Sequence, residues 1–403
     1  MESSQSRFIG ALLIVAGTTI GAGMLALPMT SIQIGYINSC WMLVGMWALM
    51  TFTALVTLEI ALKSSTADGT YGISIVGLAK ASFGRLGQFI AASSLFILFY
   101  ALLAAYITGS SSILNDIINY TFGINFSIYL SAFLYTVILG ACINSCVRMV
   151  DYANRFFFML KTFVFVGMIG VLIPYVKLDH LTHQHSEFSA LSLAIPIFFT
   201  SFGFHGSIPT LVNYVGPHPK QLRLIILLGS FIPLLIYLLW QFVTLGVLPK
   251  AASSFIVNGN VSDFINYLDI ATQNPFLGLF TKAFTFLAIA TSFLGVAIGL
   301  FDSLAEFLNW PTADQNQRLK VSLGTFLPPL CFSLFYPNGF ILALGYAAIA
   351  LSILAILIPA AVALKWRSMP LKSDYQVVGG KYSLIVVFAL GIILIGLEIL
   401  NHL

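Results

Sequence analysis

Charged residues are scarce in this chain of 403 amino acids. Only 8% of its residues are Asp, Glu, Lys or Arg, whereas 59% are hydrophobic and the mean hydropathy is +0.97. Water-soluble domains carry about 25% charged and about 45–50% apolar residues. A water-soluble fold of this length cannot cover so much apolar surface, because the buried fraction grows too slowly with chain length. The composition excludes a soluble globular protein and predicts an all-α polytopic membrane protein.

Cysteine is equally sparse, with four residues, and none is spaced as in a CxxC pair or a zinc-ligand set. Neither a disulfide framework nor a structural metal is indicated, and we expect no cofactor. His180, His183 and His185 fall close together in a polar stretch. They could bind a metal ion, but a solvated loop is the simpler interpretation because nothing fixes their geometry.

Recognisable catalytic and channel patterns are also missing. His205 and Ser207 are close in sequence, but two residues apart on a helix point to different faces. Neither a Gly-x-Ser-x-Gly nor a His-Glu-x-x-His motif accompanies them. A channel would show a repeated filter or rings of charge, and neither appears. A secondary transporter is the class that remains, with lipid as its surroundings and no nucleic-acid partner. A monomer is the simplest expectation.

Eleven apolar stretches are long enough to cross a bilayer core about 30 Å thick, which takes about 20 helical residues. They lie near 8–33, 38–62, 87–112, 126–147, 153–175, 189–213, 221–247, 276–308, 321–336, 339–364 and 383–402. A polar connection at 248–275 has room for a short helix around 262–271. An amphipathic segment is expected at 73–80, ahead of the third span.

The basic residues test this count, because cytoplasmic loops are enriched in Lys and Arg. With the N-terminus inside, the outer connections hold only Lys177 and Lys250, and Lys161 and Lys282 lie within spans. The inner side holds fourteen: Arg7, Lys63, Lys80, Arg85, Arg148, Arg155, Lys220, Arg223, Arg318, Lys320, Lys365, Arg367, Lys372 and Lys381. The bias predicts a cytoplasmic N-terminus and, after eleven spans, a C-terminus on the outer side.

The first span contains a sequence that suits a continuous helix poorly. Its stretch 17–23 reads Gly-Thr-Thr-Ile-Gly-Ala-Gly, and glycine and β-branched threonine are weak helix formers. A glycine face for tight helix packing is the alternative, but the clustering favours a break about 14–22 Å along the span, near the midplane. Irregular backbone survives at that depth only where it lines a cavity.

The sixth span offers a matching interruption. Residues 199–209 read Phe-Thr-Ser-Phe-Gly-Phe-His-Gly-Ser-Ile-Pro, again with glycines, small hydroxyl residues and a proline. Paired interruptions in equivalent spans are typical of inverted-repeat transporters. We therefore expect a single transporter domain, 1–403, with repeats at 8–175 and 189–364 and an extra span at 383–402. Exposed helix N-termini and free carbonyls at such breaks suit a zwitterionic amino acid.

These stretches resemble a known family. The sequence Ile-Val-Ala-Gly-Thr-Thr-Ile-Gly-Ala-Gly-Met-Leu at 14–25 resembles the signature of the hydroxy/aromatic amino acid permeases. Stretches 100–107, 199–207 and 290–297 resemble the tyrosine-specific members in particular. The resemblance implies a leucine-transporter-type fold, with five plus five inverted helices and spans one and six discontinuous. It also implies a bacterial inner-membrane location and symport of an aromatic amino acid with a proton. Tyrosine is favoured, while tryptophan or a broader aromatic range stays open.

The expected substrate site follows from the two breaks and the aromatic residues at their depth. Its candidate residues are Ala16, Gly17, Thr18, Thr19, Gly21, Ala22, Gly23, Tyr100, Thr200, Ser201, Phe202, Gly203, Phe204, His205, Ser292 and Tyr346. Of the aromatic ones, Phe202 and Phe204 are the strongest candidates, because they fall within the second break.

Lys161 is a charged residue inside the fifth span, and such residues are functional candidates by default. In proton-coupled relatives of this superfamily a lysine on that span stands where sodium-coupled members hold a cation. Thr291 and Ser292 on the eighth span resemble the hydroxyl pair of that cation site. Lys161, Thr291 and Ser292 are therefore predicted to form the proton-coupling site, although Lys161 as a permanently charged strut is the alternative. A sodium-coupled symporter of the same fold is the rival function.

Other ionisable residues complete the predictions. His205 titrates in a range suited to a proton relay, or it hydrogen-bonds the substrate, or it caps freed carbonyls. Glu59 and Asp302, near the cytoplasmic ends of spans two and eight, are expected to pair with basic residues in an inner gate. Lys282 and Glu398 are expected at the interface with the outer headgroups.

Overall fold

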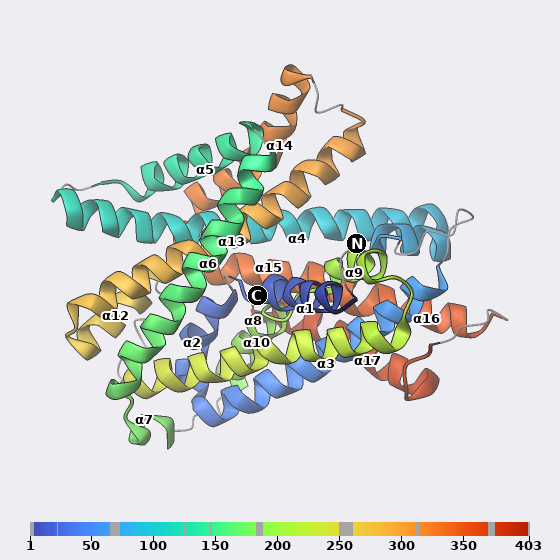
Figure 1. Cartoon of the computed structure of the whole chain (residues 1–403), viewed down its shortest axis with the longest axis horizontal. Helices are drawn as coiled ribbons and strands as arrows, with labels where there is room; N and C mark the ends of the chain where they lie inside the picture. The colour runs from blue at the N-terminus through green and yellow to red at the C-terminus, as the bar shows by residue number, and fades with distance from the viewer. Residues whose placement is uncertain are drawn as a thin grey trace.

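A computed structural model of the protein describes residues 4–21, 23–64, 73–123, 126–145, 147–182, 188–249, 261–310, 314–369 and 375–401 (Figure 1). This described part is helical and contains no strand. Its first half comprises α1 (Ser4–Thr19), α2 (Gly23–Ile34), α3 (Tyr36–Lys63), α4 (Ile75–Phe122), α5 (Ile128–Ser145), α6 (Val147–Leu172), η1 (Ile173–Tyr175) and α7 (Leu178–Thr182). Its second half comprises α8 (Phe188–Thr200), η2 (His205–Ser207), α9 (Ile208–Val215), α10 (Pro219–Val247), α12 (Val261–Thr272), α13 (Pro275–Leu308), α14 (Gln315–Phe335), α15 (Phe340–Ser352), η4 (Ile353–Leu357), α16 (Ile358–Arg367) and α17 (Gly380–Asn401).

The chain is a polytopic helical membrane protein. Within the described residues, eight helices are long and apolar enough to cross a membrane, or nine if α1 and α2 are counted as one bent span. The two predicted spans that fall short are α5 and α14. The apolar helix in α5 is short, at Ile128–Asn144, and α14 begins with polar residues and contains Pro328 and Pro329. The count of eleven spans stays a prediction.

The first span is broken, but more narrowly than its glycines predict. Helix α1 continues through Thr19, and α2 starts at Gly23 with its axis bent by 50°. Gly17 and Thr18 are therefore helical, which corrects the expected break at 17–23. The threonines are accommodated because their hydroxyls donate to carbonyls one turn earlier, Thr18 to Ile14 (2.8 Å) and Thr19 to Val15 (2.7 Å).

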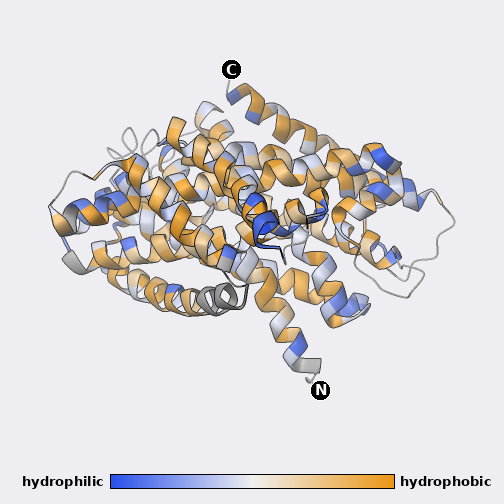
Figure 2. Ribbon diagram, turned by 90° about the horizontal axis from the view of Figure 1, so that it is seen from above, coloured by the Kyte–Doolittle hydropathy of each residue, from blue (hydrophilic) through white to orange (hydrophobic). Residues whose placement is uncertain are grey.

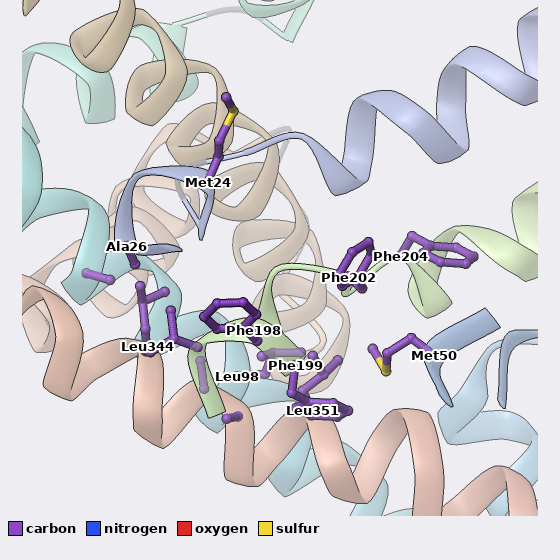
Figure 3. Packing of buried hydrophobic residues seen from close by; sticks show 14 of the residues in the cluster. Met24, Ala26, Met50, Leu98, Phe198, Phe199, Phe202, Phe204, Leu344 and Leu351 are labelled. Carbon is purple, nitrogen blue, oxygen red and sulfur yellow. The ribbon is translucent and has the colours of Figure 1, made fainter. Parts of the chain in front are cut away.

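The sixth span is interrupted where the sequence predicts it. Helix α8 ends at Thr200, residues 201–204 are not helical, and a short 3₁₀ turn leads into α9. Figure 3 shows this segment between α2 and α15, with Phe198, Phe199, Phe202 and Phe204 among its packed side chains. The interruption thus lies inside the apolar core rather than at the surface of the bundle.

The elements outside the spans also follow the sequence. The connection at 248–275 carries α12, which agrees with the helix expected at 262–271. The amphipathic segment forms the first turns of α4, and the chain then kinks at Gly84, whose φ of 64° is readily adopted only by glycine. Lys365 binds the Ser82 carbonyl ahead of this kink, so α16 anchors the segment.

Large apolar side chains cover the outside of the bundle. Hydrophobic residues dominate the helices in Figure 2, and on α6 the side chains of Met159, Phe163 and Val166 are all more than 60% exposed. A soluble monomer does not expose apolar surface on this scale. The lipid bilayer is the solvent that this surface requires.

Candidate functional site

The two interrupted spans meet at close range inside the bundle. A Cβ placed on Gly23 would lie 3.3 Å from the Cα of Ser201, the first residue after α8. A Cβ on Gly21 would lie 2.8 Å from the Oγ of Ser292 on α13. A side chain at either glycine would therefore require its neighbour to move, and glycine permits the close approach. Gly21, Gly23, Ser201 and Ser292, all predicted site residues, come together here.

Side chains from two other helices bind the carbonyls around the first break. The Tyr237 hydroxyl of α10 lies 2.7 Å from the Thr19 oxygen, and the Trp240 indole donates to the Met24 oxygen over 3.0 Å. The Lys161 ammonium of α6 donates to the Ile20 oxygen over 3.3 Å. Carbonyls that a helix no longer satisfies need such partners in a membrane. The break is held by three defined contacts.

Lys161 lies at the junction of α1, α6 and α13. Besides the Ile20 carbonyl, its Nζ donates to the Thr291 hydroxyl over 3.3 Å, and it lies 5.0 Å from the centre of the Phe158 ring. The residue is 5% exposed. No carboxylate of the described residues lies within 4.0 Å of the ammonium. Its partners are thus neutral oxygens and an aromatic face.

His205, in the 3₁₀ turn after the second break, is buried and faces α3. Its Nε2 lies 2.7 Å from the Thr53 hydroxyl, and that hydroxyl in turn lies 3.1 Å from the Met50 carbonyl. If Thr53 donates to Met50, then Nε2 carries the proton and Nδ1 is an acceptor. Nδ1 is buried and has no hydrogen-bond partner in the described part of the chain. His205 therefore contacts a threonine hydroxyl and not a freed carbonyl.

The predicted aromatic residues occupy different surroundings. Phe202 and Phe204 are buried in the second break, and Phe202 packs edge-on against Tyr237 with ring centres 5.4 Å apart. Tyr100 donates to the Gly324 carbonyl of α14 over 2.8 Å, whereas Tyr346 is exposed on α15. Of the predicted aromatic residues, Phe202 and Phe204 are thus the two that lie within a break and are buried.

Other predicted residues form the backbone of the two breaks. Ala16 accepts a bond from the Ile20 amide (3.0 Å), and the Thr200 hydroxyl bonds back to Pro196 (2.7 Å). Gly203 packs against Leu351 of α15. Ala22 lies outside the described residues.

At the C-terminal end of α3, Glu59 is the centre of a charged cluster. Its carboxylate binds Arg367 of α16 through two contacts of 2.9 and 2.6 Å, Lys63 at 3.2 Å and the Val377 amide at 2.9 Å. Burial raises the pKa of the neighbouring Tyr375 to about 12, so this phenol stays neutral at ordinary pH. Asp302, by contrast, is exposed and has Arg318 as its charged neighbour. Among the described residues, Glu59 is thus ion-paired with an arginine, whereas Asp302 makes no ion pair within 4.0 Å. A gate role for either carboxylate stays a prediction.

Glu398 corrects an expectation. The sequence places it at the outer interface, but it is only 4% exposed. Its carboxylate packs over Gly345 of α15, where the missing side chain leaves room for it. Of the loop histidines, His183 and His185 lie outside the described residues; within those described, no group of three His, Cys, Asp or Glu is placed to hold a metal ion.

Tyr237, Trp240 and Thr53 are functional candidates that the sequence analysis missed. A signal was present for two of them. Membrane aromatics with polar tips favour the two interfaces, whereas Tyr237 and Trp240 lie within the span formed by α10. Their partners are backbone carbonyls, which no sequence pattern identifies.

Comparison with known proteins places this chain in a family. The model of the tryptophan/tyrosine permease family matches residues 4–398. Tyrosine-specific transport system 1 of Haemophilus influenzae is 38% identical over 392 residues, which cover 97% of this chain and 96% of that protein. Tyrosine-specific transport system 2 of the same organism is 34% identical, covering 97% and 95%. Its tryptophan-specific transport protein is 32% identical, covering 98% and 96%.

Proposed function

The chain belongs to the tryptophan/tyrosine permease family, and on that premise we propose that it takes up an aromatic amino acid with a proton across the bacterial inner membrane. L-Tyrosine is the favoured substrate, because the two tyrosine-specific relatives share more residues with the chain than the tryptophan-specific one. Tryptophan or a broader aromatic range is the alternative. The protein is a transporter and not an enzyme.

The placement of Lys161 is the observation that carries the proton coupling. Its ammonium contacts the first break through Ile20 and the eighth span through Thr291. A charge fixed for structural reasons inside a membrane calls for a counter-ion, yet these partners are neutral. The neutral partners favour a Lys161 side chain that gains and loses a proton during transport over one that stays permanently charged. The proton carried with the substrate would bind and leave at Lys161.

The two breaks form the proposed substrate site. The N-terminus of α2 at Gly23 presents backbone amides suited to a carboxylate, and loosened carbonyls beside the breaks suit an ammonium group. Phe202 and Phe204 supply buried apolar surface for an aromatic side chain. The proposed architecture is the leucine-transporter-type repeat of 8–175 and 189–364, followed by α17. It is supported by the paired interruptions and by their contact at Gly23 and Ser201.

Purified protein in liposomes tests the substrate and the coupling ion. Uptake of radiolabelled tyrosine, tryptophan and phenylalanine is measured with proton and sodium gradients imposed separately. We expect tyrosine accumulation that follows an inward proton gradient and does not respond to sodium, because Lys161 occupies the cation position. Sodium-driven uptake at constant pH would instead support the sodium-coupled alternative.

Replacing Lys161 tests the coupling site itself. We expect K161A to lose accumulation driven by a proton gradient, by tenfold or more, because the group that binds the proton is gone. Exchange of labelled for unlabelled tyrosine across the membrane, which needs no proton gradient, should persist at a reduced rate. K282A is the matched control, since Lys282 lies on α13 toward the outer end of its helix. Undiminished gradient-driven accumulation by K161A would remove Lys161 from the mechanism.

A further inference from the structure

Tyr237 and Trp240 are two buried aromatic residues on one face of α10. They lie three positions apart, a spacing that places side chains on the same side of a helix, and neither is exposed to any measurable extent. Both carry a polar atom at the edge of an aromatic ring. Buried groups of this kind need hydrogen-bond partners, and here both find them in backbone carbonyls at the first break.

The Tyr237 hydroxyl touches the backbone of both interrupted spans. It lies 2.7 Å from the carbonyl oxygen of Thr19, the last residue of α1, and 3.0 Å from that of Ser201, the first residue after α8. A phenol has one proton to donate, so the two carbonyls share it. Both distances are satisfied only at the present separation of the two breaks. The hydroxyl therefore bridges the two breaks.

Trp240 holds the far side of the first break. Its indole N–H donates to the carbonyl of Met24, in the first turn of α2, over 3.0 Å. Tyr237 and Trp240 thus bind the chain on either side of residues 20–22. Together they limit the angle at which α2 leaves α1.

Aromatic packing immobilises both rings. The Trp240 ring lies 6.2 Å from Phe165 of α6, 6.0 Å from Phe284 of α13 and 6.3 Å from Phe264 of α12, between ring centres. Tyr237 packs edge-on against Phe202. Side chains that are locked by their neighbours can set the geometry of a site with the precision that binding requires.

We propose that Tyr237 and Trp240 are positioning residues of the transport site. Acting from one face of α10, they fix the two breaks in the arrangement that binds the amino acid. Unwound carbonyls at such breaks can coordinate a cation, and the neutral Tyr237 hydroxyl occupies two of them instead. The inference rests on the proposed function, because it assigns a role in binding the transported substrate.

Two variants remove the hydrogen bonds while keeping an aromatic ring. Y237F deletes the hydroxyl that binds Thr19 and Ser201, and W240F deletes the donor to Met24. Y175F is the matched control, because it removes a tyrosine hydroxyl that contacts the Asn274 side chain at 3.3 Å, away from the breaks. Each protein is reconstituted in liposomes, and KM and maximal rate of tyrosine uptake are measured together with melting temperature with and without tyrosine.

We expect Y237F to raise the KM about tenfold, the effect of leaving buried carbonyls without a donor, and to change the maximal rate per molecule by less than about twofold. The rise in melting temperature caused by tyrosine should shrink, since a ligand stabilises a protein according to its affinity. W240F should raise the KM about threefold, and Y175F should match the wild type.

A purely structural role would lower the melting temperature without substrate and leave the KM unchanged, and that result would overturn the inference. So would an equal effect of Y175F. If Y237F does not accumulate in the membrane, W240F decides the question by the same KM criterion. Wild-type uptake in the same liposomes reports on the proposed function separately. If the wild type transports tyrosine and Y237F has the same KM, the positioning role of Tyr237 and Trp240 is refuted, while the proposed function stands.

Discussion

At the residue scale, two glycines determine how closely the broken spans approach their neighbours. A Cβ on Gly21 would lie 2.8 Å from the Ser292 hydroxyl oxygen, and a Cβ on Gly23 would lie 3.3 Å from the Ser201 Cα, both closer than ordinary van der Waals contact. The glycine cluster therefore serves two purposes. It weakens the helix locally, as its composition suggests, and it allows a contact that any larger residue would push apart.

We predict that G21A lowers the stability of the folded protein by about 1–3 kcal/mol, the usual cost of overpacking a buried site. Its new methyl group would press on the Ser292 oxygen at 2.8 Å. The measurement is the melting temperature of the protein in detergent. The double variant G21A/S292A should recover most of the loss, because the remaining contact with the Cβ at 3.8 Å is an ordinary one.

G295A is the control for this prediction. Gly295 lies one turn from Ser292 on α13, and a Cβ there would meet nothing within 4 Å. Its melting temperature should stay close to that of the wild type. A G21A protein as stable as G295A would show that the close approach to Ser292 is not fixed.

At the element scale, two arginines connect the ends of separate helices. Glu59 of α3 binds Arg367 of α16, and Arg367 in turn donates to the carbonyls of Val377, ahead of α17, and of Gly380, its first residue. Arg318 of α14 donates to the Ile143 and Asn144 carbonyls at the end of α5. Cations at helix C-termini and paired buried charges both stabilise such junctions.

Breaking the Glu59–Arg367 pair on one side should be more damaging than removing both charges. We predict that E59Q and R367Q each lower stability by about 3–5 kcal/mol, because each removes the closest ionic partner of a charged group at the cluster. The double variant E59Q/R367Q should lose less than the sum of the two. Melting temperatures of the four proteins give this comparison.

K63Q serves as a reference, because Lys63 makes one longer contact with the same carboxylate, at 3.2 Å, and we expect a smaller loss. Strictly additive effects of E59Q and R367Q would mean that the two charges do not act as a pair. A loss of transport without a loss of stability in E59Q would support the gate predicted for Glu59.

At the scale of the whole molecule, the bilayer decides which surfaces face outward. Exposed Phe, Leu and Val side chains surround a core that contains the breaks, Lys161 and His205. A water-soluble protein has a polar surface, whereas this surface is apolar because lipid replaces water as the surrounding solvent. Membrane orientation then depends on the basic residues, fourteen of which fall on one side under the eleven-span topology.

That topology predicts a cytoplasmic N-terminus and a periplasmic C-terminus. Single cysteines placed after Met1 and before Leu403, in a protein whose four cysteines are replaced by serine or alanine, test it by labelling with a reagent that does not cross the membrane. Whole cells should label the C-terminal cysteine only. Equal labelling of both ends, or of neither, would require an even number of spans.

The sequence by itself determined the class of the protein and the position of its candidate site. The scarcity of charged residues required a membrane protein, because a water-soluble fold cannot cover so much apolar surface. Glycine and hydroxyl residues marked the interruptions, and the one at 201–204 lies where the sequence predicts it. Lys161 was identified because charge within a span is costly. These features are local, so they can be read along the chain.

Only the tertiary structure decided what each of these features contacts. The break in the first span is shorter than its composition suggests, because Thr18 and Thr19 satisfy carbonyls within α1. Glu398 is buried because Gly345, distant in sequence, leaves room for it. Tyr237 joins Thr19 to Ser201 across three helices. Hydrogen bonds to backbone carbonyls depend on the geometry of packing and not on residue identity, and the sequence alone therefore leaves them undetermined.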